Sequence, residues 1–242
     1  MPGSDRDSRA AVLAAVRAAL EATPGAGVHG HDDRLAAARQ RIASPPRPVL
    51  PERATRSGAA RIAQFIEMVR FSQASLEELD AEADIPAAIS RLCAARGLQG
   101  EVVLAGDNRL RLLDWQAAGV PVAARLVRSG DVLAVALADG GIAETGTLAL
   151  RSGPASPSTA NFLPEHHAIV VHAGRIHAGY EDYWAASRAG AGAMPRTVNW
   201  ITGPSRSGDI ELRMLMGAHG PLSVHVLLVH GGVHGGAAGV DS

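Results

Sequence analysis

From about residue 60 to residue 229, short apolar segments alternate with segments of helical period, and this alternation constrains the fold strongly. Strand candidates are EVVLAG, DVLAVAL, TLAL, HAIVVHA, TVNWITG and LSVHVLLV. Helix candidates lie around Ile62–Val69 and Asp84–Gly97 and in RLRLLDWQAAG and YEDYWAASRAG. Strands that alternate with helices are typical of a largely parallel sheet with helices on both faces.

One pair of strand candidates departs from this pattern. Asp131–Leu137 and Thr147–Ser152 are joined by the short connection ADGGIAETG, which is typical of an antiparallel hairpin. The sequence therefore predicts an α/β fold with a mixed, largely parallel sheet that is flanked by helices.

The first fifty residues have a different character. Residues 8–22 and, more weakly, residues 32–43 show helical period, and SPPRPVLPE at 44–52 holds four prolines in nine residues. Such a proline density excludes a helix or a central strand, so we expect an extended linker there. We predict a helical arm and linker at 1–50, used to contact another protein or a second subunit, a compact domain at 51–230 and a flexible tail at 231–242.

The charge balance argues against several classes of partner. The chain carries 23 basic and 24 acidic residues, neither sign clusters, and aromatic residues make up 3% of the sequence. A general nucleic-acid binder would show a basic face and stacking aromatics, so no nucleic-acid partner is expected. No apolar run is long enough to span a membrane, and MPGSDRDSRA lacks the apolar core of a signal peptide, so we expect a cytoplasmic protein.

The cysteine and histidine content argues against a resident metal or cluster. Cys93 is the sole cysteine of this sequence, so an all-thiolate iron–sulfur or zinc site and an internal disulfide are excluded. His166 and His167 are adjacent, and in a strand their side chains would point to opposite faces. We therefore expect neither a metal site nor a cofactor in this chain.

The segment GGIAETGTLALRSG, Gly140–Gly153, is the first candidate for chemistry. It places Glu144 at a turn with Thr145, Gly146 and Thr147 beside it. A carboxylate flanked by hydroxyls and backbone N–H groups can act as a base or nucleophile, or can hold a substrate hydroxyl. The alternative is a hairpin turn whose Glu is simply solvated.

The segment TGPSRSGDIELRMLMGAHGP, residues 202–221, is the second candidate. It follows a predicted strand, and ligands of open α/β sheets lie at the carboxyl ends of strands. Arg206 supplies a bidentate donor for a carboxylate or phosphate, and Asp209 and Glu211 could orient it or bind a hydroxyl. GAHGP adds a second turn that carries His219. The alternative is a surface loop with caps and ion pairs.

Three motifs in order resemble the signatures of the LUD domain family. They are IAETGTLAL at 142–150, FLPEHHAIVV at 162–171, and ITGPSRSGDIE followed by GAHGP. The resemblance implies a fold similar to that of sugar-phosphate isomerases and CoA transferases. It also implies a role in oxidising L-lactate to pyruvate beside two partner proteins that carry iron–sulfur clusters, with this chain as the non-redox component.

The same resemblance implies a pocket for a small carboxylate or phosphate. Glu144 would be its catalytic residue, and the ligand-binding residues would be Thr145, Gly146, Thr147, Gly203, Pro204, Ser205, Arg206, Asp209, Glu211, His219 and Gly220. A different function stays open at this point, namely a stand-alone isomerase- or CoA-transferase-like enzyme that uses Glu144 as base or nucleophile. Whether the chain forms a homo-oligomer is open as well.

Overall fold

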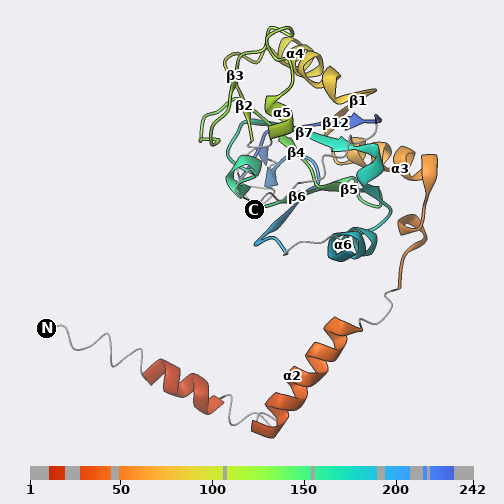
Figure 1. Ribbon diagram of the computed structural model, residues 1–242. Coiled ribbons are helices and arrows are strands. Elements are labelled where there is room, and N and C mark those ends of the chain that lie inside the picture. The colour runs from red at the N-terminus through yellow and green to blue at the C-terminus, as the bar shows by residue number, and fades with distance from the viewer. Residues whose placement is uncertain are drawn as a thin grey trace, which may run out of the picture. The chain divides into compact units, whose positions relative to one another are not determined.

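The computed structural model describes residues 11–19, 28–44, 49–105, 108–153, 156–189, 194–207, 215–216 and 219–231. The chain divides into two compact units, Met1–Leu50 and Pro51–Ser242. The first unit contains a helix over residues 11–19 and helix α2 (Val28–Ala43), and the described side chains of both helices are exposed (Figure 1). The predicted tail lies outside the described residues except for Gly231.

The second unit is built on a six-stranded sheet in which every neighbouring pair of strands is parallel, in the order β1-β12-β7-β4-β2-β3. Its strands are β1 (Ser75–Leu79), β2 (Val102–Leu104), β3 (Val122–Ala123), β4 (Leu133–Leu137), β7 (His166–His172) and β12 (Ser223–Val229). The central strands are apolar along almost their whole length, because both faces of this sheet are covered.

A four-stranded sheet of order β8-β5-β6-β9 lies on one face of the first sheet. Its strands are β5 (Gly140–Ile142), β6 (Thr147–Arg151), β8 (Ile176–His177) and β9 (Val198–Ile201). β6 is antiparallel to β5 and to β9, while β8 is parallel to β5. The predicted α/β class with a mixed, largely parallel arrangement and flanking helices is thus confirmed, although the antiparallel pairs occupy a sheet of their own.

The predicted hairpin between Asp131–Leu137 and Thr147–Ser152 is wrong, because β4 and β6 do not pair with each other: β6 pairs with β5, and β4 pairs with β7. The backbone N–H of Ala138 still donates to Val170 of the first sheet, whereas that of Asp139 donates to Ala149 of the second sheet. The chain therefore changes sheets between these two residues, and β6 pairs with the short strand β5. In β5, Gly141 leaves no room for a side chain, because a Cβ atom there would lie 2.6 Å from Cδ1 of Ile176 and 2.9 Å from the Phe65 ring.

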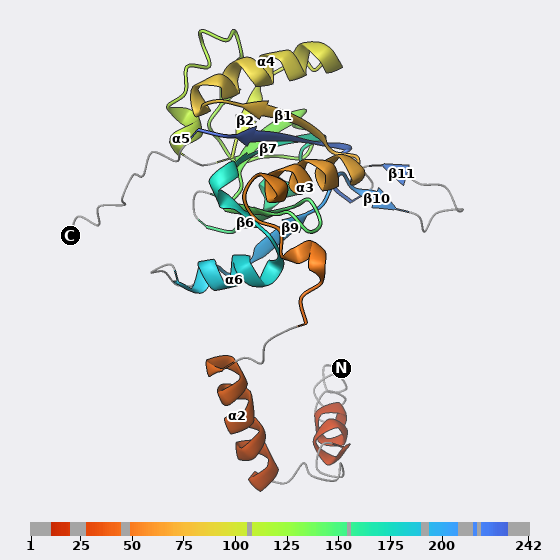
Figure 2. The same ribbon diagram turned by 90° about the vertical axis from the view of Figure 1, so that its right-hand side faces the viewer.

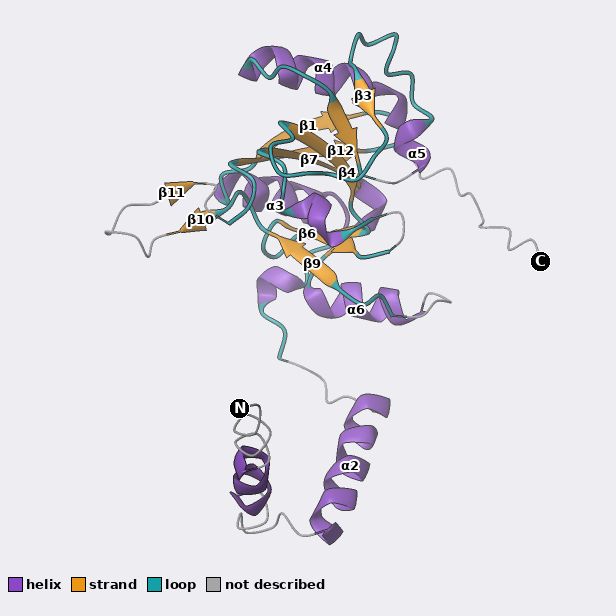
Figure 3. Ribbon diagram, turned by 90° about the vertical axis from the view of Figure 1, so that its left-hand side faces the viewer, coloured by secondary structure: helices purple, strands orange, loops and turns teal. Residues whose placement is uncertain are grey.

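Helices complete a layered arrangement (Figures 2 and 3). The helices of the second unit are α3 (Gly58–Phe71), α4 (Ile85–Arg96), α5 (Asn108–Arg111) and α6 (Tyr180–Ala189), with short 3-10 helices η1 (Glu52–Ala54), η2 (Glu82–Asp84), η3 (Ser158–Asn161) and η4 (Ala173–Arg175). α4 and α5 cover one face of the six-stranded sheet. α3 and the four-stranded sheet cover the other face, and α6 covers the outer face of the four-stranded sheet.

The predicted helix RLRLLDWQAAG is shorter than expected. α5 ends at Arg111, and residues after it form turns. The carboxylate of Asp114 accepts the backbone N–H of Ala117 at 2.9 Å, a local bond that competes with helix formation. The indole of Trp115 donates to the Leu110 carbonyl at 2.6 Å, which fixes the turn against the core.

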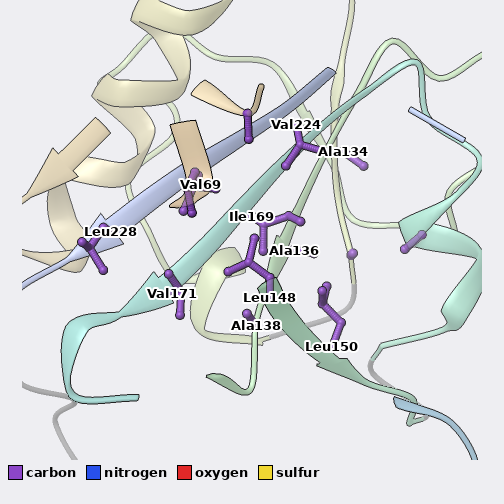
Figure 4. Close-up of a cluster of buried hydrophobic side chains, with 14 of the residues drawn as sticks. Val69, Ala134, Ala136, Ala138, Leu148, Leu150, Ile169, Val171, Val224 and Leu228 are labelled. Atoms are coloured by element: carbon purple, nitrogen blue, oxygen red, sulfur yellow. The ribbon is translucent and has the colours of Figure 1, made fainter. Parts of the chain in front are cut away.

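The largest core lies between the two sheets (Figure 4). Ala134, Ile169 and Val224 of the six-stranded sheet face Leu148 and Leu150 of β6 there. A smaller cluster under α6 contains Ile142, Ala149 and Tyr183. The four-stranded sheet is therefore packed on both faces, against the six-stranded sheet on one side and against α6 on the other.

Two further features complete the described part of the chain. β10 (Arg206–Ser207) pairs antiparallel with β11 (Leu215–Met216), and the residues between them lie outside the description. Within the described residues, no helix has the length and apolar character that crossing a bilayer requires.

Candidate functional site

Four hydroxyl groups meet where β6 begins and β9 ends. The Thr147 hydroxyl oxygen lies 2.7 Å from that of Thr145, 3.0 Å from that of Tyr180 and 2.7 Å from that of Thr202. Thr147 is fully buried. A hydroxyl can donate one hydrogen bond and accept two, so these three partners use its whole capacity. We call Thr145, Thr147, Tyr180 and Thr202 the hydroxyl cluster.

The members of the hydroxyl cluster come from four elements. Thr147 begins β6, and Thr145 lies in the turn before it. Tyr180 is the first residue of α6, and Thr202 directly follows β9. Because β6 is paired with β9, with Leu148 opposite Ile201, the two threonines that flank this pair are brought side by side.

Glu144 lies beside this cluster and is paired with a cation. Its carboxylate accepts a hydrogen bond from the Arg53 Nε at 3.0 Å, and its side chain is 10% exposed against 65% for Arg53. Arg53 belongs to η1, where its backbone carbonyl accepts the Gln64 side chain at 2.9 Å. A charge-assisted bond of this kind compensates the charge of the partly covered carboxylate.

Glycines at two turns fit against the end of α3. Gly146 has a φ of +66°, and a Cβ atom there would lie 2.5 Å from the backbone nitrogen of Val69. Gly203 has a φ of +74°, and its Cβ would clash with the carbonyl oxygen of Ser72. Both positions need glycine for its backbone conformation and for close packing. The turn at Gly146 and the turn at Gly203 thus meet at the same helix end.

A cavity of about 200 Å³ opens next to Thr202. We call it the Trp200 cavity; its lining residues are Asn161, Phe162, Trp200, Ile201, Thr202, Gly203, Pro204, Ser205, His219, Gly220, Pro221 and Val224. The loop is closed by the Ser205 N–H, which donates to the Pro221 carbonyl at 3.0 Å, and by the His219 N–H, which lies 3.4 Å from the Ser205 hydroxyl. Five residues predicted for the ligand site line this cavity, namely Gly203, Pro204, Ser205, His219 and Gly220.

The remaining predicted residues are not in the cavity wall. Glu144, Thr145, Gly146 and Thr147 are connected to it through the contact between Thr147 and Thr202. Arg206 is exposed, and its Nη2 donates to the carbonyl oxygen of Ser72. Asp209 and Glu211 lie outside the described residues. In the described part of the chain, the predicted site therefore consists of two adjoining parts, the hydroxyl cluster with Glu144 and the Trp200 cavity.

The ligand site was expected at the carboxyl ends of the sheet strands. The segment 202–221 does follow the carboxyl end of β9, but it does not lie at the carboxyl ends of the six-stranded sheet. An open hollow of about 670 Å³ adjoins the cavity, shares Phe162, His219 and Gly220 with it, and is also lined by Gly130, Glu165 and Leu222. These residues precede β4, β7 and β12, so the hollow lies at the amino ends of the parallel strands. The reason is the connection itself, because the second segment leaves β9 of one sheet and enters β12 of the other.

The polar groups of the cavity wall are neutral. The Trp200 ring itself points under α6, away from Val224, and has edge-on contacts with Tyr180, Tyr183 and Trp184 at centroid distances of 5.0, 5.1 and 5.7 Å. Asn161 is 3% exposed, and its Oδ1 atom has no hydrogen-bond partner among the described residues. The described lining residues include no Lys, Arg, Asp or Glu.

A buried histidine lies beside the cavity floor. His167 is opposite Val224 in the register of β7 and β12, and Val224 lines the cavity. His167 is 1% exposed, and burial lowers its pKa to about 4. The ring is therefore neutral at physiological pH, because removing a charged imidazolium from water is unfavourable.

Several residues of this region were not predicted from the sequence. Arg53 lies 91 positions before Glu144 and carries no local signal. Asn161 and Tyr180 belong to no motif, and Thr202 lies in the motif ITGPSRSGDIE but was not among the predicted site residues. The aromatic residues did offer a signal, since four of the five Trp and Tyr residues of the chain gather in the group of Tyr180, Tyr183, Trp184 and Trp200.

Across the described ranges, no group of three or more His, Cys, Asp or Glu side chains is placed to hold a metal ion. Cys93 is half-buried against the core under α4, and burial raises the pKa of its thiol.

Comparison with known proteins identifies the region that contains both parts of the site. Residues 133–229 match the LUD domain. The protein "Lactate utilization protein C" of an Exiguobacterium species is 31% identical over 121 residues, which cover 48% of this chain and 52% of that protein. "Uncharacterized protein YkgG" of Escherichia coli is 29% identical over 182 residues, which cover 68% of this chain and 78% of that protein.

A solved structure is similar as well. A crystal structure of a DUF162 family protein from Deinococcus radiodurans superposes with a TM-score of 0.49 and 22% identity, covering 72% of this chain and 99% of that chain. The chain spans about half the length of the Exiguobacterium protein. Both candidate segments, 140–153 and 202–221, lie inside the LUD match.

Proposed function

We propose that this chain, whose residues 133–229 match the LUD domain, is a non-redox component of a lactate-utilisation system. The observation that supports the proposal is the position of the LUD match. It contains Thr147 and Thr202, whose hydroxyls join the two parts of the candidate site. Two proteins to which this chain is similar, each 31% identical over part of its length, are named for lactate utilisation.

The proposed ligand is a small carboxylate at the mouth of the Trp200 cavity. A carboxylate accepts hydrogen bonds without donating them, so it needs donors. Thr202, Ser205 and His219 line the cavity, and their side chains carry groups that can donate. Arg206 follows directly in the chain and is the nearest cation in sequence. L-lactate and pyruvate have the required carboxylate, and a phosphate ester is the other anion that this donor set suits.

The oxidation of lactate itself is assigned to partner proteins. An iron–sulfur cluster is normally held by three or four cysteine thiolates, and Cys93 is the sole cysteine in this sequence. We therefore place the clusters in two partner proteins, which accept the electrons released when L-lactate becomes pyruvate. In this division of labour the LUD chain binds the small molecule, works in the cytoplasm, and holds no cofactor.

Calorimetry with the full chain tests the ligand. L-lactate, pyruvate and inorganic phosphate are titrated into the wild type, Thr202→Val and Ser205→Ala. Each hydroxyl contributes about 0.5–1.5 kcal/mol net, so each variant should bind about 2- to 12-fold more weakly. Thr159→Val is the matched control, because Thr159 is exposed and lies outside the cavity wall. Equal binding by the wild type and both variants would contradict the proposed position of the carboxylate.

A second measurement tests the division of labour. The purified chain should contain no stoichiometric iron, and it should not reduce an electron acceptor when L-lactate is added. Adding the iron–sulfur proteins that copurify with it should restore lactate-dependent reduction. Iron bound in a fixed ratio, or reduction by the isolated chain, would show that the chain itself carries the redox step.

An enzymatic function is the second candidate, and the environment of Glu144 supports it. The carboxylate is nearly buried, bonded to Arg53 and next to the hydroxyl of Thr145. Such a group can act as a base or as a nucleophile toward a thioester. Transfer of CoA from an acyl-CoA to lactate by the wild type, with loss of this activity in Glu144→Gln, would favour this function. Glu144→Gln is suitable because it keeps the size of the side chain.

A further inference from the structure

Two pairs of Ser and His side chains lie where three strands of the six-stranded sheet begin. The Ser75 hydroxyl lies 2.8 Å from Nδ1 of His225, and the Ser223 hydroxyl lies 2.7 Å from Nδ1 of His166. Ser75 is the first residue of β1, Ser223 of β12 and His166 of β7. We call these four residues the amino-end cluster.

The four side chains of the amino-end cluster share one face of the sheet. Ser75 is opposite His225 in the register of β1 and β12, and Ser223 is opposite His166 in the register of β12 and β7. Ser223 and His225 are two positions apart in one strand, so their side chains point the same way. Three neighbouring strands therefore present the cluster side by side.

Strand β12 shows which face this is. Leu227 and Val229 continue the alternation that starts with Ser223 and His225, and both belong to the core under α4. Val224 points the other way, into the core between the two sheets, and it lines the Trp200 cavity. The amino-end cluster and the Trp200 cavity are therefore on opposite faces of the six-stranded sheet.

Arg96 brings a positive charge to the amino-end cluster. It is exposed in the last turn of α4, and its Nη2 donates to the Ser75 hydroxyl at 2.9 Å. Among the described residues no carboxylate forms an ion pair with Arg96, whereas Arg91 of the same helix pairs with Glu77. The bond to Ser75 uses one of the five N–H groups of the guanidinium, so the others remain able to hold an anion.

The two histidines extend the set of donors. A ring whose Nδ1 accepts a serine hydroxyl carries its proton on Nε2. His225 is 8% exposed, and its Nε2 is buried without a hydrogen-bond partner among the described residues. His166 is only partly buried, and within the described ranges Ser223 is its hydrogen-bond partner. The Nε2–H of His166 is therefore a donor that a ligand can reach.

Arg96 acts on both rings. Burial, and after it the charge of Arg96, lowers the pKa of His166 and of His225. Glu165 raises the pKa of His166 and Glu77 raises that of His225, but each of these effects is smaller than that of Arg96. A bound anion would offset the charge of Arg96 and favour the protonated form of a ring beside it.

We propose that Arg96 and the amino-end cluster form a second ligand site, which binds the phosphate group of inorganic phosphate or of a phosphate monoester. The guanidinium supplies charge and planar donors, His166 supplies an N–H, and the hydroxyls of Ser75 and Ser223 can turn toward the anion. The negative end of the α4 dipole offsets part of the Arg96 charge, so the neutral donors are needed as well. This site does not depend on the proposed function.

NMR titration of the histidine rings in the full chain tests the proposal. Inorganic phosphate is added, sodium chloride at equal ionic strength is the reference, and His166→Asn identifies the signals of that ring. Phosphate should raise the pKa of His166 in a saturable way, because an anion beside the ring favours the imidazolium. Excess L-lactate should not displace it, since the Trp200 cavity is on the other face. Methyl phosphate as a second titrant distinguishes free phosphate from an ester, because a site that surrounds all four oxygens excludes the ester.

Substitution of Arg96 tests the cation. Arg96→Ala should weaken phosphate binding by about 10- to 150-fold, the loss of one charge-assisted hydrogen bond. Arg96→Lys should fall between this variant and the wild type, because lysine keeps the charge without the planar donors. Arg188→Ala is the matched control, since Arg188 is an exposed arginine in the last turn of α6. Arg96 is exposed, so its variants should fold.

The outcomes separate this site from the proposed carboxylate site. A pKa of His166 that phosphate changes no more than sodium chloride does overturns the proposal, and so does equal phosphate binding by the wild type and Arg96→Ala. Phosphate binding that is lost in Arg206→Ala and kept in Arg96→Ala places the anion at the proposed carboxylate site and overturns the second site. Phosphate binding that depends on Arg96, without any binding of lactate, supports the second site and contradicts only the proposed function.

Discussion

The hydroxyl oxygen of Thr202 lies 2.7 Å from that of Thr147, and this contact connects the two segments of the candidate site. The two residues are 55 positions apart, and the pairing of β6 with β9 brings them together. Neither hydroxyl reaches this arrangement unless the four-stranded sheet is formed. The site is therefore coupled to the integrity of that sheet.

The stability of the hydroxyl cluster should depend on Thr147. Thr147→Val keeps the shape of the side chain but leaves the hydroxyls of Thr145, Tyr180 and Thr202 each with one partner fewer. We expect the free energy of unfolding to fall by about 1–3 kcal/mol, because the three hydrogen-bond contacts of the buried Thr147 hydroxyl are lost together. Denaturant unfolding measures this loss, and the exposed Thr159→Val is the control. A loss below about 0.5 kcal/mol would show that water replaces the missing hydroxyl.

The pair of Arg53 and Glu144 should respond asymmetrically to mutation. Arg53 is 65% exposed and regains water when its partner is removed, whereas the Glu144 carboxylate is 10% exposed and does not. Arg53→Ala should therefore destabilise the protein by about 1–3 kcal/mol, and Glu144→Gln by less. Denaturant unfolding of both variants and of the double variant measures the asymmetry.

Arg56→Ala is the matched control for this pair, because Arg56 is an exposed arginine three positions further along the chain. It should leave the free energy of unfolding unchanged within about 0.5 kcal/mol. If Glu144→Gln costs more than Arg53→Ala, the carboxylate has other essential partners, and its pairing with Arg53 is secondary.

Acid should destabilise the fold through His167. Its pKa is about 4 in the folded protein, below the ordinary value of 6.5, because the ring is buried. Between these values the unfolded chain binds a proton that the folded chain does not, so stability present above pH 6.5 is lost as the pH falls toward 4. The full effect of this group is about 3 kcal/mol.

Comparing wild type with His167→Leu tests this assignment. Unfolding by denaturant is measured at neutral pH and at pH values down to the acid limit of the fold. The leucine variant should lose less stability on acidification than the wild type. Burial also lowers the pKa values of His166, His177 and His225, so the variant should keep part of the acid sensitivity. Identical pH profiles would show that His167 does not contribute.

Most elements of the fold were predictable from hydrophobic period. The apolar runs of β7 and β12 and the glycine that ends α4, Gly97, have strong local signals. The division into two sheets was not predictable in this way, because it depends on Ala138 and Asp139 bonding to different strands. When the backbone changes its hydrogen-bonding strand between two consecutive residues, the hydrophobic period of the sequence does not show it.

The candidate site was predictable in part for the same reason. Glu144 and the turn at Gly203 were marked by local glycine and hydroxyl patterns. The partners Arg53 and Tyr180 were not marked, since each comes from a distant element and is placed by packing. Asn161 is also placed by packing, in η3 against the first sheet. Local motifs therefore indicated where the chemistry lies, and tertiary contacts determine which groups take part.

Arg206 provides the last test, because two roles are open to it. Its Nη2 donates to the carbonyl of Ser72, the residue that caps the end of α3, so it holds the second segment against that helix. The same guanidinium can hold a carboxylate or phosphate through its other N–H groups. Losing a charge-assisted hydrogen bond weakens binding by about 10- to 150-fold. Arg206→Ala should show this loss with L-lactate, pyruvate or phosphate, and Arg206→Lys should fall between it and the wild type, since lysine keeps the charge without the bidentate geometry.

Calorimetry and denaturant unfolding on the same variants separate the two roles. Arg196→Ala is the matched control, because Arg196 is exposed and precedes β9. If an anion binds wild type and Arg206→Ala equally well while the free energy of unfolding falls, Arg206 acts as a clamp on α3 and takes no part in binding. If binding weakens and stability is unchanged, the guanidinium belongs to the anion site.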